Sequence, residues 1–148
     1  MKKLRPKKIT LVFILSLLLG CSSNQHKDDE IYGAWMYFDN SGMYNEVLIG
    51  DDFYITHNDV IGTTASQLLK RRRSSIVISD FDDTPVTYNF QFESDGKLLL
   101  WNDLEEFKLT PIKVNIDMKK FANDDFDEMD KYDQGFESRK SSAEGIIL

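Results

Sequence analysis

The segment Val86-Thr-Tyr-Asn-Phe-Gln-Phe-Glu93 carries the clearest structural pattern in the chain. Apolar and polar side chains alternate along it, which is typical of a β-strand that buries one face and exposes the other. The dipeptide Asp95-Gly96 follows, and it favours the positive φ angles of a tight hairpin turn. Lys97–Trp101 (KLLLW) then predicts the return strand. The residues expected on the buried face are Val86, Tyr88, Phe90 and Phe92.

Other short strands are predicted on both sides of this hairpin. Turn-forming residues separate them at regular spacing, with no long helix between, although residues 65–73 also fit one or two turns of helix. We therefore expect a mainly β domain over residues 31–112, a small antiparallel meander that forms a barrel or a sandwich. The remaining predicted strands are Ile31–Phe38, Met43–Ile49, Phe53–His57, Val60–Thr64, Gln67–Arg72, Ser75–Ser79 and Glu105–Thr110.

The C-terminal part changes character. Residues 113–133 are rich in aspartate and contain spaced apolar side chains, which predicts a short acidic helical segment. Asp125 is expected to cap a helix and to form a capping box with Glu128. The apolar stripe is irregular, so a break is expected near Asn123. Residues 134–148 are mostly polar and predict a flexible, loosely held tail.

The beginning of the chain has the order of a secretory signal. Basic residues come first, and the apolar run Ile9–Leu19 follows. A helix that crosses a bilayer needs roughly 20 apolar residues, and this run is about half as long. The basic residues are Lys2, Lys3, Arg5, Lys7 and Lys8.

The run ends in Leu18-Leu19-Gly20-Cys21, which resembles the lipobox of bacterial lipoproteins. The resemblance implies that residues 1–20 are a signal peptide and that acyl chains such as palmitate are attached at Cys21. It also implies a lipid-anchored protein of the cell envelope. Residues 21–30 are then a polar tether. In a Gram-negative cell, Ser22 implies the outer membrane, facing the periplasm. The alternative is a plain signal peptide with a cysteine there by chance.

Charge narrows the range of partners. Five of the 18 basic residues lie in the first 20 positions, so the rest of the chain has 13 basic and 25 acidic residues, a net charge of −12. Such a surface repels nucleic acid and attracts cationic partners. We therefore expect no nucleic-acid binding and favour a protein partner, which could be cationic.

Gly33-Ala34-Trp35 resembles the Gly-x-Trp motif of lipocalins and lipocalin-like bacterial lipoproteins. In that family the tryptophan closes one end of a barrel that holds a small apolar ligand, and an arginine near the last strand packs on it. Here the last strand offers Lys108, with Lys113 just after it. The alternative is a core tryptophan in another small β-fold.

Motifs for catalysis are weak. His57 and Asp59 lie across a predicted turn, but a nucleophile–base pair needs a third group, and the other histidine outside the signal, His26, falls in the tether. The aspartates do not follow the spacing of a calcium-binding loop. We therefore expect no enzyme activity, no metal site and no cofactor.

Two charged clusters are the candidate partner-binding residues. The basic cluster could dock an anionic lipid or glycan, or it could neutralise its acidic neighbours. The favoured hypothesis is a lipid-anchored, non-enzymatic protein that binds another protein, as inhibitor or immunity lipoproteins do. The alternatives are a lipocalin-like carrier of a small apolar ligand and an envelope assembly accessory. The candidate residues are Asp124, Asp125, Asp127 and Asp130 in the acidic segment, and Arg71, Arg72 and Arg73 in the basic cluster.

Overall fold

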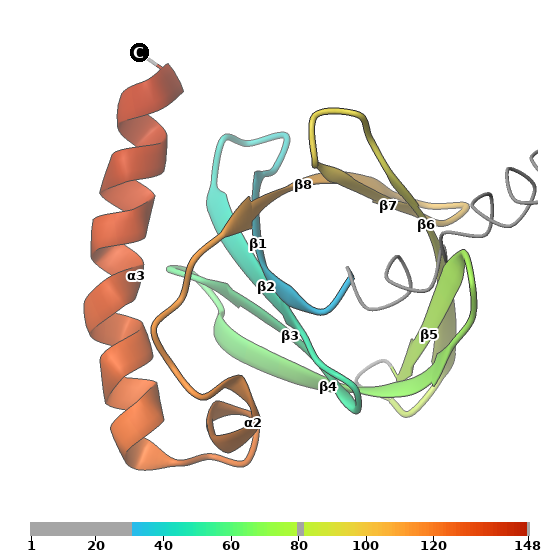
Figure 1. Ribbon diagram of the computed structural model, residues 1–148, viewed down its shortest axis with the longest axis horizontal. Coiled ribbons are helices and arrows are strands. Elements are labelled where there is room, and N and C mark those ends of the chain that lie inside the picture. Colours follow the sequence, from blue (N-terminus) through green and yellow to red (C-terminus); the bar gives the residue numbers. More distant parts are fainter. Residues whose placement is uncertain (1–30, 80–81, 148) are drawn as a thin grey trace, which may run out of the picture. The chain divides into compact units, whose positions relative to one another are not determined.

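Eight antiparallel strands close into a barrel in the computed structural model, each paired with its neighbour in sequence and β1 paired with β8 (Figure 1). The structure describes residues 31–79 and 82–147, with side chains as far as Gly145. The prediction of a mainly β antiparallel meander is confirmed, and the barrel is the form it takes. The strands are β1 (Gly33–Phe38), β2 (Tyr44–Ile49), β3 (Phe53–Asn58), β4 (Gly62–Arg71), β5 (Ser75–Ser79), β6 (Pro85–Phe92), β7 (Leu98–Trp101) and β8 (Glu106–Ile112).

The chain divides into two units at Glu30, and all described residues belong to the second. The predictions for residues 1–30, which include the signal peptide, Cys21 and the tether, lie outside the described residues.

Large apolar side chains fill the interior of the barrel. The predicted alternation in β6 is confirmed, because Tyr88 and Phe90 are buried and Val86 and Phe92 pack against the same cluster. Gly96 has a φ of 81° in the turn that follows. A barrel of eight strands is just wide enough for its side chains to fill it. The buried members of this cluster are Ile31, Trp35, Val47, Ile49, Tyr54, Leu68, Ile76, Ile78, Tyr88, Phe90, Leu98, Leu100 and Leu109.

Strand β4 corrects two predictions. The sequence suggested two short strands, and residues 65–73 also fitted helical turns, but Gly62–Arg71 is one long strand with a register shift between Leu68 and Lys70. Pairing with β3, from Phe53–Gln67 to Asn58–Gly62, holds it extended. Its inward positions at 62, 64 and 66 carry small or polar residues. The usual apolar alternation is therefore missing from the sequence.

Two helices follow the barrel, α2 (Met118–Phe121) and α3 (Phe126–Ile147). Figure 1 shows α3 lying along one side of the barrel, beside β1, β2 and β3. Phe136 and Ala143 on α3 are buried against the outer surface of these strands. The prediction of a loosely held tail from residue 134 is therefore wrong, because tertiary packing continues the helix to Ile147.

The predicted break between the helices and half of the capping box are confirmed. Asp124 has a φ of 59° between the helices, and the Asp125 Oδ1 accepts a hydrogen bond from the Glu128 N–H at 3.2 Å. The Glu128 carboxylate does not accept the hydrogen bond from the Asp125 N–H that would complete the capping box; that N–H donates to the Lys120 carbonyl. The carboxylate instead accepts from the Asp117 N–H at 2.7 Å and thereby ties α3 to the start of α2.

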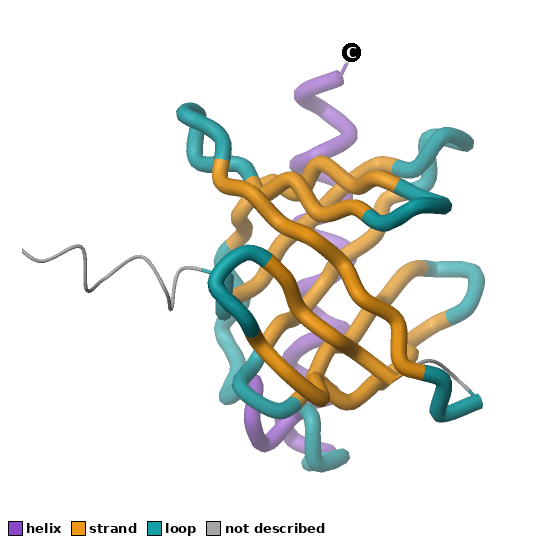
Figure 2. Tube along the Cα trace, turned by 90° about the vertical axis from the view of Figure 1, so that its right-hand side faces the viewer, coloured by secondary structure: helices purple, strands orange, loops and turns teal. Residues whose placement is uncertain are grey.

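Connections between strands gather at the two ends of the barrel (Figure 2). We call the end where Ile31 enters β1 the proximal end; it also holds the β2–β3, β4–β5 and β6–β7 connections. The distal end holds the β1–β2, β3–β4, β5–β6 and β7–β8 connections. Helix α3 runs from the proximal toward the distal end, where Lys140 pairs with Asp59 of the β3–β4 turn.

Candidate functional site

A buried carboxylate lies between the barrel and α3. Glu46 on the outer face of β2 is fully buried, and its two oxygens accept four hydrogen bonds. Arg139 of α3 donates from Nε to Oε1 at 2.8 Å and from Nη2 to Oε2 at 2.9 Å. Tyr44 donates to Oε1 at 2.7 Å and Tyr132 to Oε2 at 2.6 Å. We call these four residues the Glu46 cluster.

The local sequence explains why the cluster can form. Every residue of β2 is buried, since Val47 faces the interior while Leu48 faces the helices. On α3, a Cβ at Gly135 would lie 2.4 Å from Nη1 of Arg139, so a larger residue there would force the guanidinium to shift from its observed position. Glycine inside a helix costs about 1 kcal/mol relative to alanine. Gly135 therefore weakens the helix locally but leaves space for the Arg139 side chain.

The geometry of the Glu46 cluster suits attachment of α3 to the barrel better than it suits catalysis. A general base needs an accessible lone pair, whereas the Glu46 oxygens are buried and occupied by four donors. Burial, and then the Glu46 charge, raise the pKa of Tyr44 and Tyr132 far above the usual value, so both phenols remain donors. A buried ion pair contributes little net stability, but losing one partner is costly, so it favours one docking position for α3.

His57 belongs to this interface and not to a catalytic pair with Asp59. Its ring packs edge-on against Phe136, with centroids 4.4 Å apart, and against Tyr132 at 5.2 Å. Its Nδ1 lies 2.8 Å from the Thr63 Oγ1. Burial lowers the pKa of His57, although the nearby carboxylates of Asp133, Glu46 and Asp59 act in the opposite direction.

The candidate arginines do not form one surface. Arg71 is half-buried, and its guanidinium carbon lies 5.7 Å from the ring centroids of both Tyr32 and Phe90, within cation–π range. Arg72 and Arg73 are exposed at the β4–β5 turn, where the Arg72 N–H donates to the Ser75 carbonyl. Two of the three side chains are therefore available to a partner at the proximal end.

The candidate aspartates lie around the start of α3. Asp124, Asp127 and Asp130 are exposed, while Asp125 caps the helix. The partner-binding hypothesis for these aspartates assumes that Phe126 and Met129 both point inward. Met129 packs against the cluster between the barrel and the helices, but Phe126 is 81% exposed, so this assumption holds only for Met129. The Phe126 side chain precedes the stripe that contacts the barrel and reaches no packing partner there.

Trp35 of the Gly-x-Trp motif is a core residue of the barrel. It is buried, and its Nε1–H donates to the Ile31 carbonyl at 3.0 Å. Lys108, at the position where the lipocalin pattern suggested a packing cation, instead pairs with Glu93 at 2.5 Å. The fold thus shares with lipocalin-like carriers only a coarse likeness, a closed antiparallel barrel.

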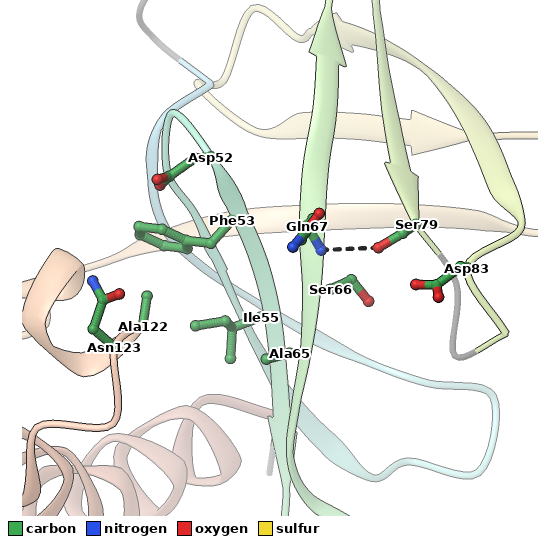
Figure 3. Close-up of a pocket in the computed structure, with 10 residues that line it drawn as sticks. All are labelled: Asp52, Phe53, Ile55, Ala65, Ser66, Gln67, Ser79, Asp83, Ala122 and Asn123. Atoms are coloured by element: carbon green, nitrogen blue, oxygen red, sulfur yellow. Dashed lines mark hydrogen bonds between the residues drawn. The ribbon is translucent and has the colours of Figure 1, made fainter.

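A pocket of about 460 Å³ lies over β3 and β4 beside α2 (Figure 3). Asp52 and Asp83 stand on opposite sides of it, and the Gln67 N–H donates to Ser79 Oγ at 3.1 Å between them. The described lining contains no histidine, cysteine, lysine or arginine. The acidic groups do not converge on one point, so this pocket does not assemble a catalytic pair.

Neither the remaining features of the described residues nor comparisons with known proteins assign a function. Across residues 31–79 and 82–147, no group of three His, Cys, Asp or Glu side chains could hold a metal ion. No helix in the described part of the chain is long and apolar enough to cross a membrane. No family model, no curated protein and no solved structure matches the chain. The structure defines the protein as a closed eight-stranded antiparallel barrel with a docked C-terminal helix.

Sequence reasoning missed the Glu46 cluster. A signal was present in β2, where apolar residues occupy both faces: Tyr44 and Leu48 on one, Val47 and Ile49 on the other. A strand buried on both faces leaves no exposed position for a charged residue. Glu46 therefore called for a buried cationic partner, although the sequence does not identify Arg139 as that partner.

Proposed function

We propose that the protein is a lipid-anchored, non-enzymatic component of the bacterial cell envelope that binds another protein through its outer surface. The filled barrel is the observation that carries this proposal. Thirteen buried apolar residues occupy the interior cluster, and partly buried aromatic residues pack against them. Carriers hold their ligands in cavities of about 300–1,000 Å³. A barrel filled by its own side chains favours binding outside the interior.

The anchor is the first part of the proposal to test. Two or more acyl chains hold a protein stably at a membrane, whereas one does so only marginally. Changing Cys21→Ser should abolish the incorporation of labelled palmitate and release the protein from the membrane fraction. A Cys21→Ser protein that is still processed and membrane-bound would refute lipidation at this residue.

The binding mode is tested on protein purified from its native envelope. After chemical crosslinking in intact cells, we expect a discrete adduct between this chain and a second protein. Organic extraction of uncrosslinked protein, followed by mass spectrometry, should yield no stoichiometric apolar molecule. An apolar ligand at one copy per chain, with no protein adduct, would favour the carrier and overturn the proposal.

A further inference from the structure

The distal end of the barrel is strongly acidic. The described residues of its four connections, 39–43, 58–62, 82–84 and 102–105, include no lysine, arginine or histidine. The proximal connections are mixed, because Arg72, Arg73, Lys97 and Lys113 lie there among acidic residues. The distal connections are therefore the more acidic, and the cation that α3 brings to them is Lys140, which pairs with Asp59. The acidic residues of the described parts of the distal connections are Asp39, Asp59, Asp82, Asp83, Asp103 and Glu105.

Apolar side chains project from two of these acidic turns. Leu104 of the β7–β8 turn is 94% exposed, and Val60 of the β3–β4 turn is 79% exposed. Both turns are fixed by an asparagine: Asn102 Oδ1 accepts from the Leu104 and Glu105 N–H groups, and Asn58 Oδ1 accepts from those of Val60 and Ile61. Apolar groups on turns that are already ordered lose less conformational entropy when a partner binds.

A cavity of about 590 Å³ opens beside Leu104, where β1 and β8 separate. The pairing of these strands ends at Met36–Thr110, although β1 continues to Phe38 and β8 begins at Glu106. The strands therefore part toward the distal end, and the cavity lies in this gap. Its lining consists of Tyr37, Phe38, Asp39, Asn40, Leu104, Glu105, Glu106, Phe107 and Lys108.

The lining combines aromatic rings with carboxylates. The rings of Tyr37 and Phe107 contact each other with centroids 5.0 Å apart and planes tilted by 55°, and Asp39, Glu105 and Glu106 belong to the same lining. Asp39 accepts hydrogen bonds from Ser41 and Met43 and Glu105 accepts one from Tyr88, which leaves Glu106 as the carboxylate most open to a ligand. Burial and the charges of Glu105 and Asp39 raise the pKa of Tyr37 to about 12. The ammonium group of Lys108 is engaged by Glu93. Aromatic faces and carboxylates together attract an organic cation, and the aromatic surface also packs on an aliphatic stem.

We infer that this cavity receives a lysine or arginine side chain from a basic surface of the partner protein, with Leu104 making apolar contact beside it. The inference rests on the proposed function and names the chemistry of the partner. An acidic end steers a basic protein toward it, and the cavity then selects an orientation. Ile31, the first residue that the structure describes, precedes β1 at the opposite end of the barrel.

The experiment titrates the full-length isotope-labelled chain in detergent micelles and follows its NMR spectrum. The probes are N-acetyl-arginine methylamide, N-acetyl-lysine methylamide and the uncharged N-acetyl-norleucine methylamide. We expect the charged probes to shift resonances of Tyr37, Leu104 and Phe107, and norleucine to shift them far less. Equal shifts with norleucine, or charged-probe shifts scattered over the acidic surface, would overturn the inference.

Matched variants distinguish binding in the cavity from general attraction to the negative charge of the protein. Glu106→Gln should weaken binding of the arginine probe about two- to fivefold, the usual contribution of an exposed ion pair. Glu137→Gln, which removes the same charge from an exposed position on α3, should leave binding unchanged. Equal effects of both variants would contradict the cavity. If a protein adduct forms in cells but the cavity binds no cation, the proposed function stands and this inference fails.

Discussion

At the scale of single residues, the position of Glu46 shows how distant side chains decide whether a charge can be buried. The carboxylate lies on β2, and its guanidinium partner lies 93 positions later in the sequence. Neither residue has a local pattern that identifies the other. Gly135 leaves space for the Arg139 guanidinium in its observed position.

Two glycines of α3 provide a matched test of this arrangement. Gly135→Ala should destabilise the protein by about 1–2 kcal/mol, because losing hydrogen bonds to a charged group outweighs the gain of about 1 kcal/mol in helix propensity. Gly145→Ala should be neutral or stabilising, since no atom lies within 4 Å of the added Cβ. Urea unfolding measures both changes. A Gly135→Ala protein as stabilised as Gly145→Ala would contradict the role given to Arg139.

His57 predicts a pH dependence of stability. Its pKa in the folded protein lies below the ordinary 6.5, because burial disfavours the charged ring. Below about pH 6.5 the unfolded chain therefore binds protons more readily than the folded chain. The free energy of unfolding consequently decreases as the pH is lowered. His57→Phe keeps an aromatic ring but cannot titrate, so its stability should change less between pH 7 and pH 5.5. His26 is present in both proteins, so its titration is common to the two profiles. Parallel profiles for parent and variant would show that His57 contributes nothing.

At the scale of elements, the sequence predicted the strands best where apolar and polar residues alternate. β6 is the clearest case, since Tyr88 and Phe90 face inward and Thr87 and Asn89 face outward. β4 could not be read this way because its inward positions are small or polar, and its pairing with β3 supplies the missing information. Propensity and pattern are local, whereas strand pairing is a property of the whole sheet.

Helix α3 was only half predicted, for a related reason. Its contact stripe consists of Tyr132, Phe136, Arg139 and Ala143, which are spaced as one helical face. Only two of these side chains are large and apolar or aromatic, and Gly135 and Gly145 weaken the helical pattern. The helix is therefore held mainly by its docking on the barrel.

Truncation after Asp133 tests the docking of α3. It removes Phe136 and Ala143 from the interface and leaves the Glu46 carboxylate without Arg139. Losing one partner of a buried ion pair alone costs about 3–5 kcal/mol, so we expect the free energy of unfolding to fall by at least about 3 kcal/mol. The dependence of this free energy on urea concentration should also be smaller, because less surface is exposed on unfolding. Phe126→Ser is the control, because this exposed side chain should contribute less than about 0.5 kcal/mol. A truncated protein as stable as the parent would restore the interpretation of a loose tail.

At the scale of the whole molecule, two exposed apolar residues lie near opposite ends of the barrel. Leu104 lies at the distal end beside the cavity, while Phe126 begins α3 near the proximal end, next to the aspartates that the sequence singled out. Net charge could be read from the sequence, but the more acidic character of the distal connections could not, because it depends on which turns the barrel brings together.

Site-specific photocrosslinking in intact cells tests the central claim, that the protein binds a partner protein through the distal end of its barrel. A photoreactive amino acid is placed at Leu104 in one protein and at Phe126 in another; both side chains are exposed, so neither change should disturb the fold. We predict a discrete protein adduct from position 104 that weakens when the cells are lysed into high salt before irradiation, and no such adduct from position 126. An adduct from position 126 alone would move the binding site to the start of α3, and the absence of any adduct from position 104 would contradict the claim.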